Sequence, residues 1–94
     1  MKSIQLHFNS DMTSLEGWMY GYLVYMEQVS PYLKENEEFV EIIIPQHIQY
    51  ISSSFLRGFC DKWMKYGSSH VLDYIHFNTE NKQLKRIISN NIYG

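Results

Sequence analysis

The sequence predicts an α/β fold with a small, open and largely parallel sheet, whose elements follow the order β-α-β-α-β-α. Segments with a helical spacing of apolar residues alternate with short segments rich in β-branched residues. This alternation is typical of parallel strands that are joined by helices. The middle strand-like segment, FVEIIIP at 39–45, is almost continuously apolar. Such a run is typical of a central strand that is covered on both faces.

The N-terminal part predicts a short strand followed by a helix. Apolar and polar residues alternate over 3–8, so this segment is expected to bury one face. From about residue 13 to 28, apolar residues recur at steps of three and four, which predicts a helix with one apolar face. The residues of that face are Leu15, Trp18, Met19, Tyr22, Leu23 and Met26. Gly17 and Gly21 let another backbone come close, and close packing on the sheet is the favoured interpretation over a partner.

The second half of the chain predicts a helix, a strand and a final helix. The helix is expected over 53–67, with apolar residues at steps of four. Residues 70–77 alternate as a third strand, and 78–94 close the chain with a helix that Thr79 or Asn78 caps. The apolar residues of the two helices are Phe55, Phe59 and Trp63, and then Leu84, Ile87 and Ile88.

Length and composition limit the functional classes. The 94 residues, 45% hydrophobic and 19% charged, predict one globular domain over 1–94. The net charge of −2 and the scattered lysines and arginines argue against a nucleic-acid partner. The longest uninterrupted apolar run, Ile42 to Ile44, is far too short to span a membrane. One cysteine, Cys60, and an N-terminus without the apolar stretch of a signal peptide predict a cytoplasmic protein.

The sequence does not predict an enzyme. The four histidines, His7, His47, His70 and His76, have no paired metal-ligand spacing, and there is no Cys-x-x-Cys pair or G-x-S-x-G motif. Cys60 lies among aromatic residues of a predicted helix, where a buried and inert thiol is expected. We therefore expect no catalytic residue, no metal and no cofactor.

Three consecutive serines stand where the central strand leads into the second helix. Ser52, Ser53 and Ser54 lie at a position where hydroxyl groups cap free backbone N–H groups and the helix dipole favours an anion. In one interpretation, one serine caps the helix and the others are turn residues. In the other, one hydroxyl accepts a phosphoryl group, or contacts a ligand or partner. A phosphate would add about two negative charges and create a local switch.

The stretch EIIIPQHIQYISSSFLRGF, residues 41–59, resembles the strand, loop and helix of STAS-like domains. In the anti-sigma-factor-antagonist branch, the strand leads to an Asp-Ser-Ser-Gly-Leu-like turn. Ser54 stands at the phosphorylated serine of that turn, while Ser52 replaces the aspartate and Phe55 the glycine. ISSSF and the later IHFN are also similar to an uncharacterised bacterial STAS-like family. Over roughly 39–92, the resemblance implies a STAS-like fold and a regulatory module with a kinase-like or anti-sigma protein partner.

The expected interaction surface runs from Gln46 to Arg57, includes His47, and is centred on Ser53, Ser54 and Arg57. Two alternatives remain beside the phosphoserine switch. The first alternative is a small phage or mobile-element inhibitor of a host complex. It is suggested by the composition, since the chain lacks alanine and is rich in isoleucine, asparagine and lysine, as in AT-rich bacterial or phage genomes. A small-ligand or nucleotide sensor is the other. Because 16% of the residues are aromatic, exposed tyrosines are expected to be available for the formation of a homodimer.

Overall fold

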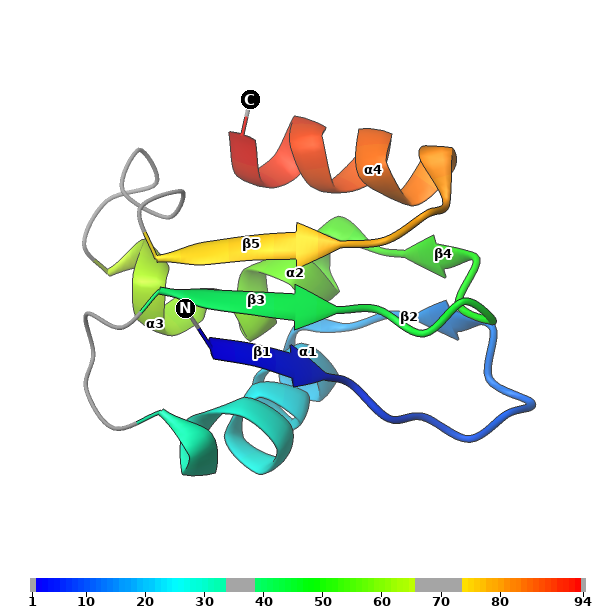
Figure 1. The fold of residues 1–94 in the computed structure, drawn as a ribbon. Coiled ribbons are helices and arrows are strands. Elements are labelled where there is room, and N and C mark those ends of the chain that lie inside the picture. Colours follow the sequence, from blue (N-terminus) through cyan, green and yellow to red (C-terminus); the bar gives the residue numbers. More distant parts are fainter. Residues whose placement is uncertain (1, 34–38, 66–73, 94) are drawn as a thin grey trace.

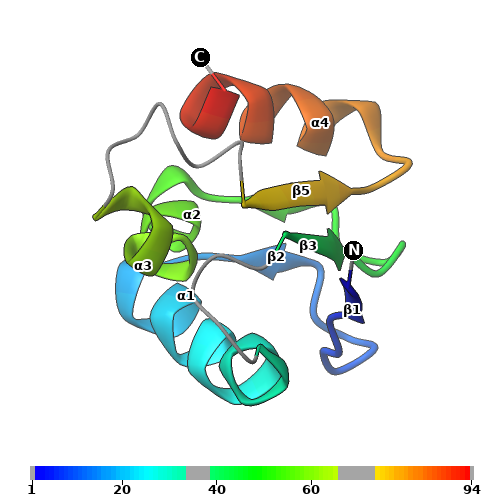
Figure 2. The ribbon, with the colours of Figure 1, turned by 60° about the vertical axis from the view of Figure 1, so that its left-hand side comes forward.

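A small parallel sheet carries the helices on one side (Figures 1 and 2). The computed structural model describes residues 2–33, 39–65 and 74–93. Its strands are β1 (Lys2–Gln5), β2 (Ser14–Leu15), β3 (Val40–Ile43), β4 (Tyr50–Ile51) and β5 (Ile75–Asn78), and its α-helices are α1 (Trp18–Val24), α2 (Ser53–Phe59), α3 (Asp61–Met64) and α4 (Lys82–Ile88). The short π-helix η1 (Tyr25–Val29) and the 3-10 helix η2 (Ser30–Tyr32) continue α1, and the short π-helix η4 (Ser89–Tyr93) continues α4. The predicted fold class is confirmed.

The main sheet has the parallel strand order β1-β3-β5, with β3 in the centre (Figure 1). Ile42 of β3 pairs with Ile4 of β1 on one side and with Phe77 of β5 on the other. Because side chains alternate between the two faces of a strand, these residues share the face that the helices cover. The buried side chains of this face are Ile4, Leu6, Val40, Ile42, Ile44, Ile75 and Phe77. The predicted face of the first strand is confirmed, and residues 70–73 of the predicted third strand lie outside the described residues.

The opposite face of the sheet is polar. Glu41, in the centre of this face, accepts hydrogen bonds from Ser3 Oγ at 2.8 Å and from Asn78 Nδ2 at 3.2 Å. Its side chain therefore links all three strands. The helices lie on the other side of the sheet (Figure 2). The prediction that the central strand is covered on both faces is wrong. The reason is that a carboxylate within the apolar run keeps this face solvated.

A second, two-stranded pair determines where α1 begins. Ser14 of β2 pairs with Tyr50 of β4 in parallel, and Gly17 follows with φ +96°, a left-handed conformation that glycine adopts readily. The predicted helix start near residue 13 is therefore wrong, and the helix begins at Trp18. Because β2 and β4 lie side by side and each leads into a helix, α1 and α2 begin close together.

α1 and α2 pack with their backbones in close contact. A Cβ atom on Gly21 would lie 2.1 Å from the backbone oxygen of Phe55, and one on Gly58 would lie 1.9 Å from that of Trp18. Only glycine fits at these two positions. The prediction that Gly17 and Gly21 pack on the sheet is wrong, because Gly21 packs on α2 and Gly17 has no atom within 4 Å of an added Cβ.

The predicted helix over 53–67 is interrupted at Cys60, which separates α2 from α3. Its expected apolar side chains are confirmed in the core, since Phe55, Phe59 and Trp63 are at most 2% exposed. Phe59 also lies against Phe77 of β5, with 5.7 Å between the ring centroids. Residues 66 and 67 of the predicted helix lie outside the described residues.

The last helix covers the remaining part of the core. Asn81 caps α4, because its Oδ1 accepts hydrogen bonds from the backbone N–H groups of Gln83 and Leu84. The predicted caps, Thr79 and Asn78, are wrong, since Thr79 Oγ1 instead accepts from the Asn81 N–H. The predicted apolar stripe is confirmed: its side chains Leu84, Ile87 and Ile88 are buried or packed against the core. Within the described ranges, no helix is long and apolar enough to cross a membrane.

Candidate functional site

Ser52 holds the start of α2 in place. Its Oγ accepts a hydrogen bond from the backbone N–H of Phe55 at 3.1 Å, and the side chain is half-buried. The same Oγ lies 3.3 Å from the backbone N–H of Gly17, at the start of α1. Ser52 therefore has the structural role that one of the three serines was expected to have, and it also ties two helix starts together.

Ser53 and Ser54 are the first two residues of α2, and both are exposed. Ser54 Oγ lies 3.0 Å from Ser52 Oγ, so the two hydroxyl groups form a pair at the helix start. Arg57 is also exposed and follows Ser54 by three residues, which puts both on the same side of α2. The structure thus brings Ser54 and Arg57 together on an open surface.

Gln46 and His47 take other partners. Both lie in the turn after β3, where Gln46 Nε2 donates to Glu80 Oε2 at 3.4 Å and His47 Nε2 hydrogen-bonds the Asn9 carbonyl at 3.1 Å. They therefore link loops at the carboxyl ends of the strands. In the part of the chain that the structure describes, neither side chain hydrogen-bonds to a serine.

The solvent side of α1 and η1 carries a row of large apolar side chains, which we call the α1 stripe. It consists of Trp18, Met19, Tyr22, Leu23 and Met26. Four of them, Trp18, Met19, Leu23 and Met26, are 42%, 63%, 45% and 43% exposed. The rings of Trp18 and Tyr22 stack, with 5.4 Å between their centroids and 9° between their planes. The row is therefore an ordered apolar surface of the folded protein.

These residues belong to the face that was predicted to be apolar. Leu15, the first residue of that face, is buried in β2, whereas the stripe residues lie outside the core. The core side of the helix consists instead of Gly21, Val24, Tyr25 and Val29. Both sets fit helical spacing, so periodicity alone gives no preference between them. The glycine is the decisive residue, because Gly21 lets the α2 backbone approach and thereby turns Val24 and Tyr25 inward. The sequence does contain a sign of the exposed stripe, because the same helical segment has two apolar faces and only one of them can face the core.

The α1 stripe begins beside the start of α2. The backbone oxygen of Trp18 lies against Gly58, and Gly17 donates to Ser52. The exposed apolar residues of α1 and the exposed Ser54 and Arg57 of α2 thus lie on adjacent helices. The site combines exposed apolar side chains on α1 with a hydroxyl group and a guanidinium group on α2.

Cys60 and the potential metal-ligating side chains can be placed directly in the structure. Cys60 is fully buried, and burial raises the pKa of its thiol far above the ordinary value of 9.0, so the thiol stays protonated. Across 2–33, 39–65 and 74–93, no three His, Cys, Asp or Glu side chains meet in a way that could hold a metal ion.

Comparisons with known proteins give no relative of this chain. No protein-family model, no curated protein and no solved structure matches it.

Proposed function

We propose that this chain is a non-catalytic module that regulates another protein by binding it through the α1 stripe and the adjoining start of α2. The exposed apolar row carries the proposal. Soluble proteins rarely expose large contiguous apolar patches, and those that do commonly use them as interaction sites. Tryptophan, tyrosine, methionine and arginine are the residue types that protein interfaces favour.

The spacing of the stripe suggests how the partner binds. Trp18, Tyr22 and Met26 follow one another at steps of four, as do Met19 and Leu23. This is the spacing with which an amphipathic helix anchors in an apolar groove of its partner. We therefore propose a partner protein with an apolar groove, whose rim accommodates the guanidinium group of Arg57.

The partner class follows from the sequence and stays a prediction. The resemblance of 39–92 to STAS-like domains suggests a kinase-like or anti-sigma protein, and we propose a cytoplasmic location for the complex. An inhibitor of a host complex could use the same stripe without any modification of Ser54. The modification state of Ser54 is therefore the property that separates a regulated module from a constitutive inhibitor.

Charge placed in the stripe should abolish partner binding without unfolding the protein. Met19→Arg and Leu23→Arg put a cation where apolar contact is required, and we expect at least about a tenfold loss of affinity. Because both side chains are exposed, the free energy of unfolding should change by no more than about 0.5 kcal/mol. Affinity purification from the native host, followed by titration of the recovered partner, measures the first effect, and urea unfolding measures the second.

Gln83→Arg is the matched control, since it adds the same charge at an exposed position of α4. It should leave partner binding unchanged. Equal binding by the wild type and both stripe variants would refute the proposed surface.

Phosphorylation of Ser54 should weaken the complex. A phosphate adds about two negative charges next to an apolar contact area, and we expect about a tenfold lower affinity for the partner. Intact-mass analysis of protein from its native host should show a phosphorylated form that Ser54→Ala lacks and Ser53→Ala retains. Recovery of only unmodified protein under all growth conditions would leave the constitutive inhibitor as the better interpretation.

A further inference from the structure

β1 is an edge strand, and half of its backbone groups point away from the sheet. Lys2 and Leu6 donate their backbone N–H groups to Phe39 and Ile43, toward β3. Because successive residues of a strand point their N–H and C=O groups to alternate sides, those of Ser3, Gln5 and His7 point to the free edge. An edge of this kind is a template for pairing with another extended chain.

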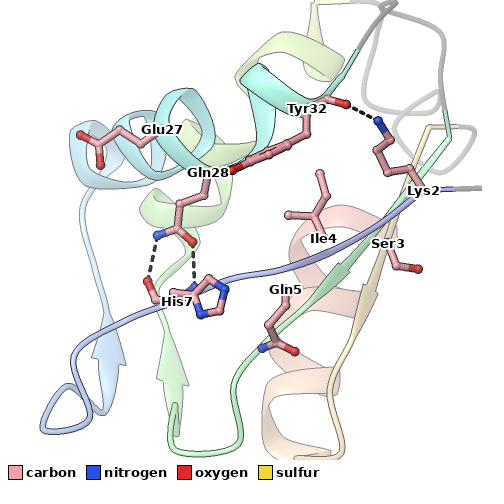
Figure 3. Close-up of a pocket in the computed structure, with 8 residues that line it drawn as sticks. All are labelled: Lys2, Ser3, Ile4, Gln5, His7, Glu27, Gln28 and Tyr32. Atoms are coloured by element: carbon pink, nitrogen blue, oxygen red, sulfur yellow. Dashed lines mark hydrogen bonds between the residues drawn. The ribbon is translucent and has the colours of Figure 1, made fainter.

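Gln28 shows where such a chain would lie. Its side-chain Oε1 accepts from the His7 N–H at 2.7 Å, and its Nε2 donates to the His7 carbonyl at 2.8 Å (Figure 3). The amide of Gln28 thus occupies the place of a peptide group in a neighbouring strand. Among the described residues, no group fills the equivalent places beside Ser3 and Gln5.

A groove of about 520 Å³ runs along this part of the edge (Figure 3). β1 forms one wall, and Tyr32 and Gln28 form the other. Tyr32 is 59% exposed, and its ring lies opposite Ile4, so an apolar side chain would find partners on both sides. The Gln28–His7 pair lies at one end of the groove, and a hydrogen bond from Lys2 Nζ to the Tyr32 carbonyl lies at the other.

We propose that this groove binds an extended segment of a partner protein, which adds to β1 as a further strand and pairs with the backbone of Ser3 and Gln5. Charge complementarity selects the segment. Lys2 lies at one end of the groove, whereas the Glu27 carboxylate points away from the groove (Figure 3). The segment carries an apolar side chain between Ile4 and Tyr32 and an acidic group near Lys2.

The shape of the groove favours one extended chain over a second copy of this protein. The free edge of β1 faces η1 and η2 across the groove, so a segment that pairs with β1 must fit between them. A second β1 would bring its own η1 and η2 against those of the first copy. This surface differs from the α1 stripe in residues and in chemistry, so an experiment can refute one of the two proposals without refuting the other.

A peptide library displayed on phage provides the probe. Selection on the full chain should enrich segments that carry one large apolar residue close to an acidic residue, and a synthetic peptide of the enriched sequence then serves in titrations. Gln5→Pro removes the outward N–H while leaving the bonds to β3, as proline does on edge strands, and should weaken peptide binding by about tenfold or more. Gln5→Ala keeps the N–H and should bind within about twofold of the wild type.

Amide hydrogen exchange tests the proposal without any variant. Saturating peptide should slow exchange of the Ser3 and Gln5 amides and leave those of Ser53 and Ser54 unchanged. Three results would overturn the proposal: no saturable peptide binding, protection confined to α1, or equal affinity of the Pro and Ala variants. Dimerisation with protection at β1, seen by sedimentation of the chain alone, would instead assign the edge to a second copy and would also overturn it.

Discussion

Ser52 shows how a single hydroxyl group can determine a local structure. Its Oγ is within hydrogen-bonding distance of the Phe55 N–H, the Gly17 N–H and the Ser54 hydroxyl. The serine triplet was predicted to lie at a helix start, and that placement is confirmed. The contact with Gly17 could not be predicted, because it joins residues 35 positions apart that only the β2–β4 pairing brings together.

Removal of this hydroxyl should cost more than removal of its neighbour. Ser52→Ala loses the cap of α2 and leaves the Gly17 N–H without its acceptor, so we expect a loss of about 1–2 kcal/mol in the free energy of unfolding. Ser53→Ala removes an exposed hydroxyl and should change that free energy by less than about 0.5 kcal/mol. Urea unfolding of the two variants beside the wild type measures the difference, and similar values would contradict the assigned cap.

At the scale of elements, the contact between α1 and α2 determines the orientation of both helices. It depends on Gly21 and Gly58, each of which lies against the backbone of the other helix. The periodicity of the sequence predicted that a helix exists here and that it has apolar residues at helical steps. It did not predict which face is buried, because that choice depends on the glycine that faces α2.

A methyl group at either glycine should destabilise the protein, against the usual trend. Glycine to alanine within a helix normally stabilises by about 0.5–1 kcal/mol. Here the added carbon would overlap a backbone oxygen, so Gly58→Ala and Gly21→Ala should each cost about 2–3 kcal/mol, as overpacking does. Gly17→Ala, with open space but φ +96°, should cost only about 1–2 kcal/mol. Thermal and urea unfolding give all three values, and stabilisation by Gly58→Ala would contradict the packing.

At the scale of the whole molecule, one hydrophobic core lies between a three-stranded sheet and the helices on one of its faces (Figure 2). The opposite face stays polar, with Glu41 bridging Ser3 and Asn78. The Cα radius of gyration of 12.2 Å is close to the roughly 12 Å expected for a compact chain of this length. Cys60 lies fully inside this core, so its ionisation is linked to the stability of the whole fold.

The protein should lose stability above pH 9 because of this thiol. Burial raises the pKa of Cys60 above its ordinary value of 9.0, so the folded thiol stays protonated while the unfolded one ionises. The unfolded state then binds fewer protons, and the free energy of unfolding falls by about 1 kcal/mol between pH 9 and 10. Cys60→Ala should lack this contribution. Urea unfolding at several pH values compares the two proteins, and parallel profiles would refute the linkage.

The sequence by itself determined the alternation of main-sheet strands with helices, the buried face of the first strand, the aromatic core of the second helix and the helix start at the serines, but not the β2–β4 pair or the break at Cys60. These features depend on spacing within a few residues, which local periodicity and capping chemistry encode. The tertiary structure decided the start of α1, the outward orientation of its apolar stripe and the free edge of β1. Each of these depends on residues distant in sequence: β4 for the helix start, Gly58 and Phe55 for its orientation, and the strand order for the edge. Pairing and close packing across such distances are set by the fold as a whole, because a helix or strand pattern does not identify its neighbour.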